Sequence, residues 1–130
     1  MKNFIFIILI FITTISCNKN LETANKLEGS WEMTKSSLNN VEDDNPNGKG
    51  TIIMFSKYNK DNGIIEIEYK NIYVGSYKDT GLYSILNEGE MLKVEIGGTN
   101  QSFNFTLEGN ELHLNSIDNP GSATNIYIKK

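Results

Sequence analysis

The chain has 130 residues with 12 basic and 16 acidic side chains, and this length suits one domain with a single hydrophobic core. Every basic side chain is a lysine, so the bidentate contacts that arginine makes with phosphates and carboxylates are absent. With a formal net charge of -4, the chain is not expected to bind nucleic acid, nor to be drawn to anionic lipids by its surface charge.

The first seventeen residues have the order of charge and hydrophobicity of a secretory signal. Lys2 supplies a positive charge, residues 4–12 are consecutive bulky apolar residues, and small or β-branched residues lead up to Cys17. The apolar run is shorter than the roughly 20 residues that a transmembrane helix needs. The sequence therefore predicts an exported protein from which residues 1–16 are removed.

Ser16-Cys17 at the end of this segment resembles the lipobox of bacterial lipoproteins, in which a small residue precedes the cysteine that is acylated and becomes the mature N-terminus. The resemblance implies acyl chains such as palmitate on Cys17, and several chains on one residue hold a protein stably on a bilayer. It also implies a cell-envelope location, most simply the outer membrane, with the domain facing the periplasm or the cell surface. An ordinary secretory signal with an incidental cysteine is the alternative.

Residues 17–26 are polar and lack a sustained period, so we expect them to be a lipidated tether that precedes a domain over residues 27–130. Within that domain, short segments in which apolar and polar residues alternate are separated by Gly, Asn and Asp, which is typical of strands and hairpin turns. Strands are expected from Trp31 and Met33 onward and over residues 51–56, 64–70, 72–77, 82–86, 91–96, 102–107, 111–115 and 124–129.

The short turns predict an all-β fold in which consecutive strands pair antiparallel. We expect an up-and-down meander of about eight strands closed into a barrel, because closure removes exposed edges, with a two-sheet β-sandwich as the alternative. The inward-facing side chains are expected to be Trp31, Ile65, Tyr69, Tyr83, Ile85, Leu92, Val94, Phe103, Phe105, Leu112 and Ile126. Their bulk favours a narrow or filled interior.

The segment Leu27-Glu28-Gly29-Ser30-Trp31 resembles the G-x-W opening of lipocalins and of the short lipocalin-like lipoproteins of Bacteroidota. Residues 81–85, 105–114 and 126–130 add to this likeness, which spans nearly the whole mature domain. The resemblance implies a barrel with an apolar pocket, in which the tryptophan closes one end beneath a cation from a late strand. Lipocalins use arginine there; this chain has no arginine, and a lysine such as Lys129 is a candidate to take its place.

Residues suited to catalysis or metal binding are sparse. His113 is the single histidine and is expected on the solvent face of its strand beside Glu111, which is too little for nucleophilic catalysis or for a metal site. The acidic pairs at positions 66/68 and 88/90 are expected to face solvent. Residues 43–48 match the first positions of a calcium loop, but Met54 stands where the bidentate Glu is required, so a polar turn is predicted.

We therefore predict a protein that is not an enzyme and has no metal or cofactor. The favoured function is a membrane-anchored binding module for a small apolar or amphipathic ligand, attached to the membrane through the lipid on Cys17. The candidate ligand contacts are Trp31, Tyr69, Tyr83, Phe103 and Phe105. The alternative is a cell-envelope interaction protein, an inhibitor or an assembly accessory, with a filled barrel core and a protein partner that binds the loop over residues 39–49.

Overall fold

The computed structural model describes residues 19–118 and 123–130, so the expected signal peptide and Cys17 lie outside the described residues. In chain order the elements are α2 (Lys19–Leu27), β1 (Gly29–Leu38), β2 (Val41–Asp43), β3 (Ile52–Phe55), β4 (Gly63–Asn71), β5 (Gly75–Leu86), the 3-10 turn η1 (Asn87–Gly89), β6 (Met91–Ile96), β7 (Thr99–Glu108), β8 (Glu111–Ser116) and β9 (Thr124–Lys129). No helix among the described residues has both the length and the apolar character needed to span a bilayer.

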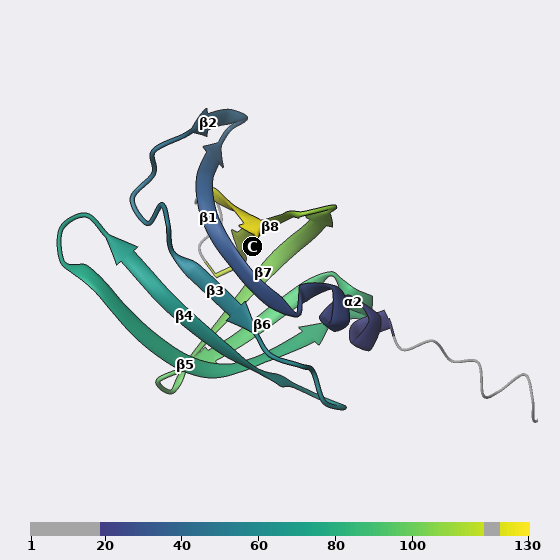
Figure 1. Ribbon diagram of the computed structural model, residues 1–130. Helices are drawn as coiled ribbons and strands as arrows, with labels where there is room; N and C mark the ends of the chain where they lie inside the picture. Colours follow the sequence, from purple (N-terminus) through teal and green to yellow (C-terminus); the bar gives the residue numbers. More distant parts are fainter. Residues whose placement is uncertain (1–18, 119–122) are drawn as a thin grey trace, which may run out of the picture.

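The strands form one antiparallel sheet that closes on itself (Figure 1). From β3 to β9 each strand pairs with the next strand in the chain, and β1 pairs with both β3 and β9. The short strand β2 pairs with the end of β1 and lies outside this circle. The predicted barrel is therefore confirmed, with eight strands in the barrel and one added at its rim, and the sandwich alternative is excluded.

The hydrophobic core lies inside the barrel and runs from Ala24 to Tyr127 along the chain. Its largest fully buried side chains include Trp31, Phe55 and Tyr83. At roughly 1.5 to 3 kcal/mol for each large apolar side chain removed from water, this core is the main source of stability.

Residues 19–27 form a helix that packs on the barrel rather than a tether. Ala24 and Leu27 are both fully buried, and the indole Nε1 of Trp31 donates a hydrogen bond to the Leu27 carbonyl at 2.8 Å. Helix α2 contacts β5 and η1, so it covers the barrel end where β5 finishes. The prediction of an aperiodic tether is wrong for residues 19–26, because only two side chains of a short, polar helix are buried and no repeating pattern results.

Trp31 lies at this same end of the barrel, beneath a lysine of the last strand. The Nζ atom of Lys129 is 5.3 Å from the centroid of the indole ring, within the range of a cation–π contact. Gly29 has a φ of +123°, and a Cβ at that position would lie 3.3 Å from Cε of Lys129. Lys129 therefore lies over Trp31 as expected, and Gly29 leaves room for the lysine side chain.

The inward-facing residue of β9 is Tyr127 rather than Ile126. Residues directly opposite each other in an antiparallel pair share a face, and the buried residue Leu112 is opposite Tyr127. Ile126 is opposite His113, so both face outward, where Ile126 is nevertheless buried. The prediction that Ile126 faces inward is wrong. His113 faces outward as expected, but it is partly buried because Ile126 lies beside it.

Residues 72–74 form the turn between β4 and β5 rather than part of a strand. The side-chain Oδ1 of Asn71 accepts hydrogen bonds from the backbone N–H of Tyr73 at 2.8 Å and of Val74 at 3.3 Å. Gly75 follows with a φ of +83°, which favours glycine. The asparagine and the glycine override the strand preference of Ile72, Tyr73 and Val74, so the predicted strand over residues 72–77 is wrong in its first half.

Replacing Leu27 with alanine tests whether α2 is part of the folded domain. Because Leu27 is fully buried, Leu27→Ala should lower the free energy of unfolding by about 2 to 4 kcal/mol. Asn25→Ala on the exposed side of the same helix should change it by less than about 0.5 kcal/mol. Urea unfolding followed by tryptophan fluorescence measures both, and equal stability of the two variants would show that α2 is not docked.

Candidate functional site

A cavity of about 340 Å³ occupies the half of the barrel interior that lies away from α2. Its walls are mostly apolar and include Ile53, Phe55, Ile65, Leu92, Val94 and Leu114. Of the two expectations, a narrow or a filled interior, this half of the barrel is therefore narrow rather than filled. The volume lies at the small end of the range of roughly 300 to 1,000 Å³ that is usual for ligand sites.

Two of the bulkiest side chains that were expected inside the barrel, Trp31 and Tyr83, lie at the α2 end. Tyr83 packs edge-on against Phe55 with ring centroids 5.0 Å apart, and its ring centroid is 5.5 Å from that of Tyr58. The Tyr83 hydroxyl donates a hydrogen bond of 2.6 Å to the Ser56 carbonyl, which fixes the ring in the core. Together with Trp31, these rings close one end of the barrel and leave room at the other.

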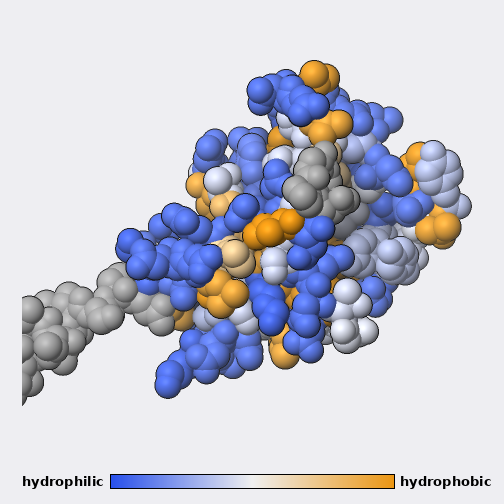
Figure 2. Space-filling model, turned by 180° about the vertical axis from the view of Figure 1, so that it is seen from behind, coloured by the Kyte–Doolittle hydropathy of each residue, from blue (hydrophilic) through white to orange (hydrophobic). Residues whose placement is uncertain are grey.

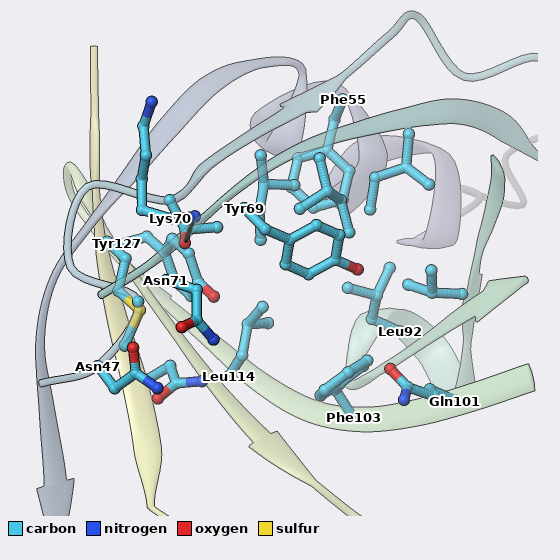
Figure 3. A pocket seen from close by; sticks show the side chains of 18 residues that line it. Asn47, Phe55, Tyr69, Lys70, Asn71, Leu92, Gln101, Phe103, Leu114 and Tyr127 are labelled. Carbon is cyan, nitrogen blue, oxygen red and sulfur yellow. Dashed lines mark hydrogen bonds between the residues drawn. The ribbon is translucent and has the colours of Figure 1, made fainter. Parts of the chain in front are cut away.

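Polar side chains gather where the cavity opens. Asn47, Asn71 and Asn125 are among its lining residues, together with Gln101 and Lys70. Figure 3 shows the amide groups of Asn47 and Asn71 on one side of the cavity, with Phe55 and Leu92 on the other. We call this polar opening the mouth. The cavity thus has apolar walls inside and hydrogen-bonding side chains at its mouth, an arrangement that suits an amphipathic ligand.

The orientation of two mouth amides is set by hydrogen bonds to the β4–β5 turn. Oδ1 of Asn47 accepts the N–H of Ile72 at 3.4 Å, and Oδ1 of Asn71 accepts the N–H groups of Tyr73 and Val74. The oxygen of each amide is therefore engaged, and its NH₂ group remains as a donor at the mouth. These donors suit an oxygen acceptor on a ligand, such as a carbonyl or a carboxylate.

The charge of Lys70 at the mouth is balanced within the same hairpin. Its Nζ atom lies 2.8 Å from Oε1 of Glu68 and 3.2 Å from Oγ of Ser76. The hydrogen bond from Lys70, supported by the charges of Lys70 and Lys78, lowers the pKa of the Glu68 carboxyl below its ordinary value. The Glu68 carboxylate therefore offsets the charge of the Lys70 side chain, and the mouth presents little net charge to a ligand.

The hairpin of β4 and β5 extends beyond its neighbours as a two-stranded arm, which we define as residues 69–81. Pairing between β4 and β5 continues to Asn71 and Gly75, whereas β3 pairs no further than Glu68 and β6 begins to pair at Leu82. Tyr69 and Tyr77 stack on one face of the arm, with ring centroids 4.6 Å apart and an interplanar angle of 20°. The arm projects from the barrel on the side away from α2 (Figure 1).

Two of the five predicted ligand contacts line the cavity and three do not. Tyr69 and Phe103 are lining residues. Trp31 and Tyr83 are core residues of the closed end, and Phe105 is buried outside the lining. Sequence reasoning missed the mouth amides, although Asn71 and Gly75 on either side of an apolar run are a recognisable turn signal.

A cluster of Glu108, Glu111 and His113 lies on the outer face of the barrel. One ligand atom from each side chain falls within 4.8 Å of the others, and Nε2 of His113 is 3.9 Å from Oε2 of Glu111. Nε2 is inaccessible to solvent and has no hydrogen-bond partner among the described residues. Because a metal ion needs an open approach to this nitrogen, the arrangement is better described as an ion pair, formed when the imidazole is protonated, than as a metal site.

Comparison with known proteins identifies the fold alone. No family model matches the sequence, and no curated protein matches it. Among solved structures, a de novo designed fluorescence-activating β-barrel matches with a TM-score of 0.54 and 10% sequence identity. The match covers 83% of this chain and 97% of the designed chain. An eight-stranded antiparallel barrel of this kind fits the lipocalin-like barrel that the G-x-W segment predicts.

The burial of Tyr83 predicts alkaline instability. Burial raises the pKa of the Tyr83 phenol to about 12, with smaller contributions from Tyr58 and Glu28, whereas a tyrosine in the unfolded chain ionises near 10. The folded state then retains its proton longer than the unfolded state, so this contribution to stability is complete below about pH 10 and is lost as the pH rises towards 12.

Urea unfolding between pH 9 and about 11.5 measures this effect. Tyr83→Phe should flatten the fall in the free energy of unfolding above about pH 10, because phenylalanine has no proton to lose. Tyr73→Phe, on the exposed turn, is the matched control and should keep the slope of the wild type. Equal slopes in both variants would show that the Tyr83 phenol does not titrate in this way.

Proposed function

We propose that this chain is a membrane-anchored, lipocalin-like lipoprotein whose barrel binds a small apolar or amphipathic molecule. The observation that carries this proposal is the cavity of about 340 Å³ with apolar walls and a mouth of amide side chains. Such a site removes apolar surface of a ligand from water and offers hydrogen bonds to its polar end. The volume suits one compact ring system or one short acyl chain rather than a two-chain lipid.

Membrane attachment is supported by the N-terminal sequence and by the position of α2. The lipobox-like Ser16-Cys17 ends two residues before Lys19, the first residue of the helix, and two residues span at most about 7 Å. Acyl chains on Cys17 would therefore hold the α2 end of the barrel near the membrane. The mouth, at the opposite end, would face the periplasm or the cell exterior.

The alternative function, an interaction protein with a filled core, is less well supported. It requires an interior without room for a ligand, which the cavity contradicts. The loop over residues 39–49, which this alternative assigns to a protein partner, instead contributes Asn47 and Gly48 to the cavity lining. An enzymatic function has no set of catalytic side chains among the described residues to support it.

Two substitutions on β7 test the binding site. Phe103 lines the cavity, so Phe103→Asp should weaken binding of the probe 1-anilinonaphthalene-8-sulfonate by roughly tenfold or more, because a charge enters an apolar wall. Thr106→Asp places the same charge on the exposed face of the same strand and should leave affinity within about twofold of the wild type. Fluorescence titration gives both affinities, and circular dichroism verifies folding.

Native mass spectrometry of the mature protein from its source cells gives an independent test. A co-purified small molecule that is lost in Phe103→Asp would support the proposal. Failure of the wild type to bind the probe, together with a bare native mass, would contradict it.

A further inference from the structure

The turn at the end of the arm exposes three consecutive apolar side chains, Ile72, Tyr73 and Val74, which we call the tip. Their exposed fractions are 75%, 82% and 74%, so each of these residues is mostly in water. Figure 2 shows apolar side chains at this end of the hairpin, projecting from a mostly hydrophilic surface. An exposed group of large apolar residues on a projecting turn is costly in water and usually marks an interaction site.

The backbone N–H groups of the tip are all hydrogen-bonded within the protein. The N–H of Ile72 is bonded to Oδ1 of Asn47, and the N–H groups of Tyr73 and Val74 are bonded to Oδ1 of Asn71. Moving a backbone N–H out of water costs least when the N–H is already bonded within the protein, and this holds also for the partly hydrated interfacial layer of a bilayer. All three donors of the tip meet this condition, so the tip can leave water without losing a hydrogen bond from its N–H groups.

The charges around the tip indicate a partner that is not selected by charge. Glu68 lies 2.8 Å from Lys70 and 3.6 Å from Lys78, and Asp79 follows on the arm. These two basic and two acidic side chains leave the region close to neutral. A strongly anionic surface would gain little from it, whereas a zwitterionic surface suits it.

The shape of the tip favours a lipid surface over a protein. A stable protein interface buries about 800 Å² on each partner and involves roughly 20 to 30 residues, far more than three side chains at the end of a hairpin supply. The interfacial layer of a bilayer needs no complementary shape, and tyrosine is enriched there because its ring is apolar and its hydroxyl is polar.

We propose that the tip inserts into the interfacial layer of a zwitterionic lipid bilayer. Asn71, which lines the cavity, immediately precedes Ile72, so insertion brings the mouth close to the lipid surface. Insertion of the tip is a function beyond ligand binding, and it does not require a ligand in the cavity. Because β5 has 12 residues and runs from the tip to the α2 end, the two ends are roughly 35 Å apart along this strand.

Vesicle flotation tests the proposal with residues 17–130 carrying Cys17→Ser, which is the mature chain that the proposed processing leaves, without a cysteine to acylate. The wild type should float with phosphatidylcholine vesicles, and the triple variant Ile72→Ser, Tyr73→Ser, Val74→Ser should partition roughly tenfold less. The matched control is Ile64→Ser with Leu82→Ser, two exposed side chains that are opposite each other on the same strands near the α2 end. It should keep partitioning within about twofold of the wild type.

The position of the tip in the bilayer gives a second readout that does not depend on loss of binding. Tyr73→Trp should be quenched by brominated phosphatidylcholine, whereas Trp31, which is 1% exposed, should not respond in the wild type. Failure of the wild type to float, a need for anionic lipid, or equal flotation of the triple variant would each overturn the proposal. Probe binding in the cavity should be unchanged in the triple variant, so failure here is distinguishable from failure of the binding function.

Discussion

Backbone pairing of β1 with both β3 and β9 closes the barrel, and the cavity exists because of this closure. The first residues of β1, Gly29 to Glu32, pair with β3, and residues 31–37 pair with β9. A β-bulge between Met33 and Lys35 bends the strand as it passes from one neighbour to the other. Without this strand the sheet would have two open edges and the apolar interior would be exposed to water on one side.

Closure also gives the barrel two different ends. At one end α2, Trp31 and Lys129 form a plug, in which the indole is hydrogen-bonded to the Leu27 carbonyl and contacts the ammonium group. At the other end the arm extends beyond its neighbouring strands, and the amides of Asn47 and Asn71 hold its turn in place. The same two amides line the cavity, so the turn of the arm lies directly beside the mouth. The mouth and the tip therefore lie at one end of this small domain, and the plug closes the other.

The sequence predicted the barrel because apolar and polar residues alternate along each strand, and this alternation indicates which side chains face inward. It does not state how far along the barrel axis each side chain lies. Tyr69 and Tyr83 therefore looked equivalent in the sequence, yet one lines the cavity and the other fills the closed end.

Helix α2 was missed because Ala24 and Leu27 are its only buried residues. The turn after Asn71 was missed because a side-chain oxygen replaces the backbone partner that a strand would use. Long-range register, which places Tyr127 rather than Ile126 inside, is likewise absent from local patterns.

The central claim is that the barrel is plugged at the α2 end and can be occupied at the other. Methyl-resolved NMR during titration with 1-anilinonaphthalene-8-sulfonate tests it most directly, because it reports on both ends in one experiment. The account predicts large shifts for the methyl groups of Ile53, Ile65 and Val94, which line the cavity, and small shifts for Leu27 and Ile85 in the plugged half. Unshifted cavity methyls at saturating probe, or equal shifts at the two ends, would contradict it.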